Sequence, residues 1–165
     1  MSELSPLAKV KAIVYDCDGV LTDNKVIVDE FGHEWATFNR GDGFAISKLF
    51  EMGIRQLVIS TETNPIVLKR CQKLKLPVFN NVHNKLSILQ EYLKGEGLDK
   101  DCVLYVGNDI NDFECMSAVG IRGCPRDAEP EVKKMCEWVS SKNGGAGVVR
   151  ELYRDICKVK GISCQ

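Results

Sequence analysis

The sequence lacks any apolar run long enough to span a membrane, and residues 1–10 lack the apolar stretch of a signal peptide. It also lacks a charge imbalance, because the formal net charge is −1. No overall field therefore favours nucleic acid or a membrane surface as a partner. These absences predict a cytoplasmic protein that binds neither nucleic acid nor membranes.

Eight cysteines are present, but no two of them form a C-x-x-C pair, so a zinc site has little support. Most lie inside predicted helices or strands, where cysteine acts as a small hydrophobic residue. We expect reduced thiols, with Cys164 the most exposed. The glycine-rich segment 144–147 lacks the Lys-Ser/Thr pair of a P-loop, which argues against a nucleotide-binding loop of that kind.

The residues that are present fit one domain over residues 1–165, with a hydrophobic content of 44% and no internal repeat. We predict a three-layer α/β fold of Rossmann type with a mostly parallel sheet. Its central strands should include residues 12–15, 55–60 and 102–106. Further short strands are expected near residues 77–79 and 121–125, and helices over residues 44–52, 65–74, 86–95, 129–136 and 148–158.

Three other segments carry separate expectations. Residues 26–28 and 34–38 read as a β-hairpin whose Trp35 and Phe38 indicate an interface; the alternative is that both rings pack on their own domain. Residues 40–43 and 140–147 are expected to be flexible or mobile loops because of their glycines.

The apolar run 12–15 is followed at once by Asp16, Asp18 and Gly19. Two carboxylates at the end of a buried strand are costly unless a cation or a reaction needs them. Backbone alternation points both the same way, and a hard divalent cation accepts such oxygen ligands. The alternative is an ordinary Asp-Gly turn after a strand.

Polar residues also follow two other predicted strands, and a lysine begins a predicted helix. Ser60 ends the second strand, and a doubly wound sheet places ligands at the carboxyl ends of its strands. Taken alone, Ser60 fits a helix-capping residue and Lys85 fits a solvated surface lysine. Their positions between Asp18 and the polar segment 107–112 favour a shared site.

Residues 16–22, Asp-Cys-Asp-Gly-Val-Leu-Thr, resemble motif I of the haloacid dehalogenase (HAD) superfamily. The resemblance implies that Asp16 is a nucleophile that forms an aspartyl-phosphate, and that Asp18 is the acid–base group. It implies that the Ser60 hydroxyl binds the phosphoryl group and that Lys85 holds the phosphate and Asp16. A carboxylate can attack phosphorus once Mg²⁺ has neutralised the phosphate charge.

Residues 107–112, Gly-Asn-Asp-Ile-Asn-Asp, resemble motif IV of that superfamily, which usually has an acidic metal ligand where this chain has Asn108. The resemblance implies a Mg²⁺ site made by Asp16, the main-chain carbonyl of Asp18, and Asn108 or Asp109. Asp112 fits the outer-shell acidic position. An asparagine can still give Mg²⁺ a neutral oxygen ligand.

Over nearly its whole length the chain resembles the small, capless HAD branch of sugar-acid phosphatases. This branch contains the 3-deoxy-D-manno-octulosonate 8-phosphate phosphatases and the nonulosonate (KDN, N-acylneuraminate) 9-phosphate phosphatases. The resemblance implies a homotetramer with a hairpin from each subunit. It also implies a nonulosonate 9-phosphate substrate in preference to an octulosonate 8-phosphate, and substrate binding by Glu62, Arg70, Lys73 and Asp42. The alternative is that these residues form a solvated surface cluster.

Three classes of function remain open on the sequence. The favoured class is a Mg²⁺-dependent phosphatase for a 2-keto-3-deoxy sugar acid phosphate. Asn108 and a similarity to the HAD domain of acylneuraminate cytidylyltransferases favour a catalytically weak domain with an assembly or regulatory role in sialic-acid activation. The third class is a receiver-like signalling domain, against which the hairpin and the glycine-rich segment argue.

Overall fold

A computed structural model describes residues 5–164 and contains one six-stranded, fully parallel sheet in the order β5-β4-β1-β6-β7-β8. β1 lies at the centre between β4 and β6, so the three strands that the sequence predicts as central are neighbours. The strands are β1 (Ala12–Tyr15), β4 (Arg55–Ile59), β5 (Val78–Phe79), β6 (Val103–Val106), β7 (Ile121–Cys124) and β8 (Trp138–Val139).

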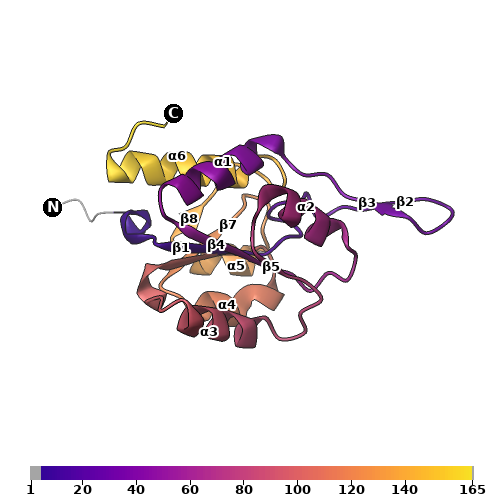
Figure 1. The fold of residues 1–165 in the computed structure, drawn as a ribbon, viewed down its shortest axis with the longest axis horizontal. Coiled ribbons are helices and arrows are strands. Elements are labelled where there is room, and N and C mark those ends of the chain that lie inside the picture. The colour runs from indigo at the N-terminus through magenta and orange to yellow at the C-terminus, as the bar shows by residue number, and fades with distance from the viewer. Residues whose placement is uncertain (1–4, 165) are drawn as a thin grey trace.

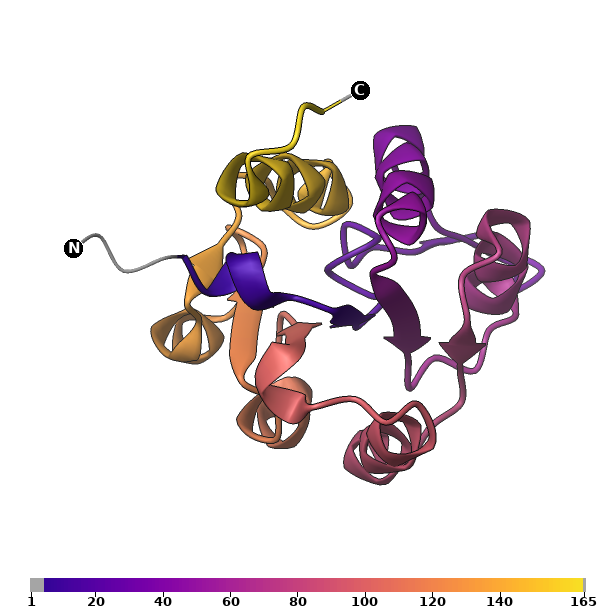
Figure 2. The same cartoon turned by 60° about the vertical axis from the view of Figure 1, so that its left-hand side comes forward.

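Helices cover both faces of the sheet, which confirms the predicted three layers (Figures 1 and 2). One face carries α1 (Arg40–Glu51), α2 (Ile66–Leu74) and α6 (Val148–Lys160). The other carries α3 (Lys85–Gly95), α4 (Phe113–Ser117) and α5 (Pro130–Met135). Short 3-10 helices span Pro6–Lys9, Lys100–Cys102 and Ile110–Asp112. Within residues 5–164, no helix has the length and apolar character needed to cross a membrane.

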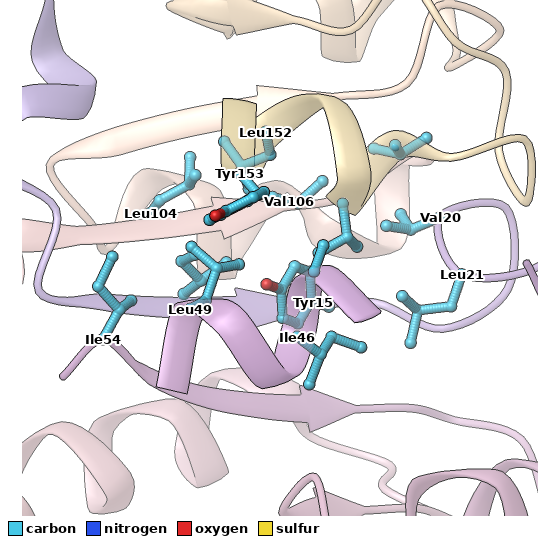
Figure 3. Close-up of a cluster of buried hydrophobic side chains, with 14 of the residues drawn as sticks. Tyr15, Val20, Leu21, Ile46, Leu49, Ile54, Leu104, Val106, Leu152 and Tyr153 are labelled. Atoms are coloured by element: carbon cyan, nitrogen blue, oxygen red, sulfur yellow. The ribbon is translucent and has the colours of Figure 1, made fainter. Parts of the chain in front are cut away.

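The alternation of side chains along β1 divides the core into two parts. Ile13 and Tyr15 pack toward α1 and α6, whereas Ala12 and Val14 pack toward α3 and α4. All four are fully buried, as expected for a central strand with a helical layer on each side. Figure 3 shows the first part, in which Tyr15 lies among side chains of α1, α6 and β6. The sheet is therefore held in a fixed position beneath the site at its carboxyl edge.

The predicted hairpin is present, although its strands are shorter than expected. β2 (Ile27–Val28) pairs with β3 (Glu34–Trp35), and Gly32 adopts a φ of 82° in the turn. The hairpin projects from the body of the molecule (Figure 1). Its apolar side chains are unusually exposed: Val26, Ile27, Val28, Phe31 and Trp35 are between 50% and 78% accessible. Phe38 instead packs against the core, so only Trp35 fits the predicted exposed interface.

Residues 40–43 are not a flexible loop; they form the first turn of α1, which corrects the sequence prediction. The Asn39 side chain caps the helix by accepting a hydrogen bond from the Gly41 N–H at 2.7 Å. Asp42 adds an acidic residue to this first turn, where the helix dipole favours negative charge. The capping chemistry outweighs the low helix propensity of the two glycines.

Residues 140–147 are likewise packed against other parts of the chain, contrary to the predicted mobile loop. Gly144 is buried, and the Gly145 N–H donates to the Val20 carbonyl at 3.0 Å. The preceding strand β8 was missed because two residues are too few to show a strand period. All eight cysteines are free thiols, and Cys164 is exposed, which confirms the prediction of reduced cysteines.

Asp42 is a buried carboxylate that joins α1 to α6. Only 3% of the residue is exposed, and Oδ1 accepts the Arg150 N–H at 2.8 Å in the first turn of α6. Oδ2 is buried without a hydrogen-bond partner among the described residues. Burial raises the pKa of Asp42 to about 6, although the Arg150 N–H and the charge of Arg70 oppose the rise.

We expect Asp42 to make the protein less stable as the pH rises. Its folded pKa of about 6 is above the ordinary value of 3.8, so its contribution to folding is complete below about pH 4 and is lost through about pH 6. In Asp42→Asn this titration is absent while the amide oxygen still accepts the Arg150 N–H. Urea unfolding between about pH 4 and about pH 7 should therefore show the variant gaining stability relative to wild type as pH rises. A constant difference between the two proteins would contradict the buried charge.

Candidate active site

The candidate site lies where three neighbouring strands end. Asp16 follows β1, Ser60 follows β4, and Asn108 lies two residues after β6. Tyr15 of β1 is opposite Val58 of β4 and Val106 of β6, so β1 and β6 end at the same level and β4 ends one residue further on. The parallel sheet thus brings together side chains that are far apart in the sequence.

Lys85, the first residue of α3, joins two of these segments. Its Nζ lies 2.9 Å from Asp16 Oδ1 and 2.8 Å from Asp112 Oδ1. All three side chains are at most 7% exposed. The predicted contact between Lys85 and the Asp16 carboxylate is therefore present in the fold.

Burial and charge oppose each other in this cluster. Burial raises the pKa of Asp16 to about 7, the charge of Asp112 adds to the rise, and Lys85 opposes it. Burial by itself lowers the pKa of Lys85, but the carboxylates of Asp16 and Asp112 together outweigh it and raise that pKa above its ordinary value. Lys85 therefore stays cationic, whereas the pKa of Asp16 lies near neutral pH.

Asp112 is fully buried and holds the cluster together. Besides Lys85, its Oδ1 accepts the Tyr105 hydroxyl at 2.9 Å, and its Oδ2 accepts the Asn108 N–H at 3.1 Å. These contacts place Asp112 against Lys85, while its outer-shell position around a metal stays a prediction. Tyr105 was not predicted, because in the sequence it is one more residue of a buried apolar strand.

Asp18 is partly exposed, unlike Asp16. Its Oδ1 accepts the Thr22 hydroxyl at 3.2 Å. Burial raises the pKa of Asp18, the bond from Thr22 opposes the rise, and the charge of Glu62 adds to it. A carboxyl group with a raised pKa at an accessible position is suited to giving a proton to a substrate and taking one back. Thr22, a residue of motif I, was not assigned this contact from the sequence.

Asn108 completes a set of three polar groups that suits a hard cation. One terminal atom of its carboxamide lies 2.9 Å from the main-chain oxygen of Asp18 and 3.1 Å from Asp16 Oδ2. When that atom is the nitrogen, it donates hydrogen bonds to both oxygens. When the amide is turned over, three oxygens converge without a donor, which is the environment that Mg²⁺ requires.

Of the two alternative metal ligands, Asn108 rather than Asp109 faces this position. Asp109 Oδ1 accepts the N–H of Ile110 at 2.6 Å and caps the 3-10 helix that follows. In the described part of the chain, no three His, Cys, Asp or Glu side chains form a metal-binding group. A metal here would therefore depend on the amide oxygen and the main-chain carbonyl as well as on Asp16.

Ser60 and Glu62 form the next part of the site. Ser60 is 1% exposed, and its Oγ accepts the Glu62 N–H at 3.1 Å. The Glu62 carboxylate accepts the N–H groups of Thr63 and Asn64, both at 2.7 Å. The charge of Glu62 also acts on Asp18, so the two carboxylates are near enough to interact.

The structure does not join the other predicted substrate residues to Glu62. The guanidinium carbon of Arg70 lies 5.7 Å from the centre of the Phe38 ring, and the charge of Arg70 acts on buried Asp42. Lys73, three residues further on, is exposed. Arg70 and Asp42 therefore form a separate cluster between α1 and α2, and within residues 5–164 no hydrogen bond or ion pair links it to Glu62.

Comparisons with known proteins agree with this geometry. The family model of haloacid dehalogenase-like hydrolases matches residues 53–152. A 3-deoxy-D-manno-octulosonate 8-phosphate phosphatase from Haemophilus influenzae is 30% identical over 158 residues, which cover 95% of this chain and 88% of the relative.

Solved structures have the same fold over most of their length. A HAD family protein from Streptomyces avermitilis is 37% identical, with a TM-score of 0.88 over 90% of this chain and 86% of that one. The cobalt-bound octulosonate 8-phosphate phosphatase from Haemophilus influenzae is 29% identical, with a TM-score of 0.89 over 94% and 92%. Sequence, fold and site agree, and the chain belongs to the haloacid dehalogenase-like hydrolases.

Proposed function

We propose that the chain hydrolyses the phosphate monoester of a 2-keto-3-deoxy sugar acid. The observation that carries this proposal is the buried contact of Lys85 with Asp16 and Asp112, directly beside the more exposed Asp18. This arrangement provides a nucleophile, a fixed cation and a proton donor within one site. The substrate class comes from the names of the relatives, which are octulosonate 8-phosphate phosphatases.

Asp16 and Asp18 divide the reaction between them. A carboxylate oxygen of Asp16 forms a bond to phosphorus while the ester P–O bond breaks, and the proton of Asp18 goes to the leaving oxygen. Ionised Asp18 then takes a proton from water, the water oxygen bonds to phosphorus, and the bond to Asp16 breaks. Phosphate is released and both carboxyl groups return to their starting state.

Four other residues support these steps. Lys85 holds Asp16 in place and neutralises negative charge near the phosphoryl group, and the Ser60 hydroxyl binds a phosphoryl oxygen. Asp16, the Asp18 carbonyl and Asn108 would hold Mg²⁺, which supplies further charge neutralisation on the phosphate when bound. Asp112 holds Lys85 and the Asn108 main chain in place near Asp16 through an ion pair and a hydrogen bond.

Substitution of the two aspartates tests this mechanism. We expect Asp16→Asn to abolish turnover because an amide is a poor nucleophile, and Asp18→Asn to reduce it by about 10²–10⁴-fold. Phosphate release from sugar-acid phosphates with Mg²⁺ is the measurement, and Asp101→Asn, an exposed site, is the control. Near-normal turnover by Asp16→Asn would contradict the covalent mechanism. A wild type that releases no phosphate would favour the assembly or regulatory role instead.

We propose further that the substrate is a nonulosonate 9-phosphate, with the octulosonate 8-phosphate of the named relatives as the second candidate. Glu62 supports this choice, because its charge reaches Asp18 and its carboxylate could accept hydrogen bonds from sugar hydroxyls. Arg70 and Lys73 on α2, and Asp42 on α1, are the remaining candidates for substrate binding. A cation on α2 would suit the carboxylate of a 2-keto acid.

Exchange of Glu62 for a cation separates the two substrates. We expect the wild type to have the higher kcat/KM for the 9-phosphate, and Glu62→Arg to move the preference toward the 8-phosphate by about tenfold or more. Glu51→Arg, which makes the same change in charge on the exposed end of α1, is the matched control. An unchanged preference in Glu62→Arg would remove Glu62 as the selecting residue.

We also propose a homotetramer in which the hairpin β2–β3 contacts other copies of the chain. The support is its apolar surface, with Phe31 78% and Trp35 50% exposed. Light scattering should give the mass of four chains, and the double variant Phe31→Ser/Trp35→Ser should lower it. Ile162→Ser, which removes an exposed apolar side chain elsewhere, should not. A monomeric wild type would overturn the proposal.

A further inference from the structure

The glycine pair Gly144-Gly145 lies directly against the turn that follows Asp18. A Cβ atom on Gly144 would lie 2.1 Å from the Gly19 carbonyl oxygen and 2.8 Å from that of Thr22. A Cβ atom on Gly145 would lie 2.7 Å from the Asp23 nitrogen. These neighbours are main-chain atoms, so no change of side-chain rotamer relieves the contact.

Close approach alone explains the glycine at position 144. Its φ is outside the left-handed region, whereas Gly145 has a φ of 69°. An alanine is therefore compatible with the backbone angles of Gly144 but not with its surroundings. An ordinary contact is 3.4–4 Å, so the added methyl group must push the two segments apart by more than an ångström.

The segment that carries the glycine pair is anchored by two carboxylates. Asp127 Oδ1 accepts the Gly144 N–H at 2.9 Å. Glu151 in the first turn of α6 accepts the Ser141 N–H at 2.8 Å and also the Ser140 hydroxyl. These hydrogen bonds hold the segment in place where it packs against the turn that follows Asp18.

The turn of residues 19–22 is linked to the two groups of Asp18 that face the site, its carboxylate and its main-chain carbonyl. The Thr22 hydroxyl, which donates to the Asp18 carboxylate, also accepts the Gly19 N–H at 3.3 Å. Gly19 has the Asn108 side chain on its other side, because a Cβ there would lie 2.0 Å from the amide. Movement of Gly19 or Thr22 therefore moves the Asp18 carboxylate, its carbonyl, or both.

We propose that Gly144 and Gly145 are positioning residues for Asp18. They fix the backbone of residues 19–22, and through it they set the place of the Asp18 carboxylate and of its main-chain carbonyl. The part that concerns proton transfer rests on the proposed phosphatase function, whereas the part that concerns the carbonyl does not need turnover. The C-terminal segment is then part of what orients the site.

Gly144→Ala tests the inference with two readouts. Displacement of the Asp18 carbonyl should weaken Mg²⁺ binding, measured by calorimetry without substrate, by about tenfold. Displacement of the carboxylate should lower kcat for a sugar-acid phosphate by about 10²-fold. The first-turnover release of p-nitrophenol from p-nitrophenyl phosphate should fall much less, because that leaving group needs no proton. A merely destabilised protein would lose both activities equally.

Gly95→Ala is the matched control, since nothing lies within 4 Å of a Cβ at that position. If Gly144→Ala does not fold, Asp127→Ala replaces it, because it removes only the exposed support of the Gly144 N–H. Its matched control is Asp99→Ala, another exposed carboxylate that accepts one main-chain N–H. Unchanged Mg²⁺ affinity in a folded variant, or equal losses with both substrates, would overturn the inference. A wild type that binds Mg²⁺ but hydrolyses neither substrate would overturn the proposed function alone.

Discussion

The ion pairs of Lys85 with Asp16 and Asp112 are the interaction on which the rest of the site depends. Three buried charges are tolerated only because each faces an opposite charge at hydrogen-bond distance. With both carboxylates ionised, the cluster carries one excess negative charge. A proton on Asp16, whose pKa is raised to about 7, or a divalent cation beside it can neutralise that charge. Binding of a cation and ionisation of Asp16 are thus linked.

The parallel sheet is what allows so few residues to form this cluster. β1 and β6 are neighbours that end at the same level, so Asp16 after one strand and Asp112 after the other meet at a common point. Lys85 reaches that point from the first turn of α3, where the Asn84 side chain caps the helix by accepting the Ser87 N–H. Local capping chemistry therefore sets the place of Lys85, the member of the cluster that comes from the start of α3.

Two further features shape this arrangement. Asn108 offers an amide where an acidic ligand is usual, so its nitrogen can satisfy Asp16 and the Asp18 carbonyl when no cation is bound. The C-terminal segment packs on the turn after Asp18 and on α1, where Asp42 accepts the Arg150 N–H. The C-terminal segment therefore connects α1 with the turn that follows Asp18.

The sequence by itself determined the elements and the chemistry that are written locally. The strand at 12–15, the hairpin turn, most helices and the group Asp16, Asp18, Ser60 and Lys85 could be predicted, because spacing and residue type carry that information. The first turn of α1 could not, since a side-chain cap outweighed the two glycines that suggested a loop. Other element boundaries differ from the predicted ones by a few residues, because the ends of helices and strands are weakly marked in a sequence.

Only the tertiary structure decided which polar groups meet. It turned Asn108 rather than Asp109 toward Asp16, gave Tyr105 and Thr22 their partners, and placed Arg70 with Asp42 instead of with Glu62. It also placed Gly144 on the Gly19 carbonyl, where the sequence indicated a mobile loop. Each of these contacts joins side chains or main-chain atoms whose directions depend on the packing of whole elements. A linear pattern of residue types does not contain those directions, and so the physical basis of the site appears only in the folded chain.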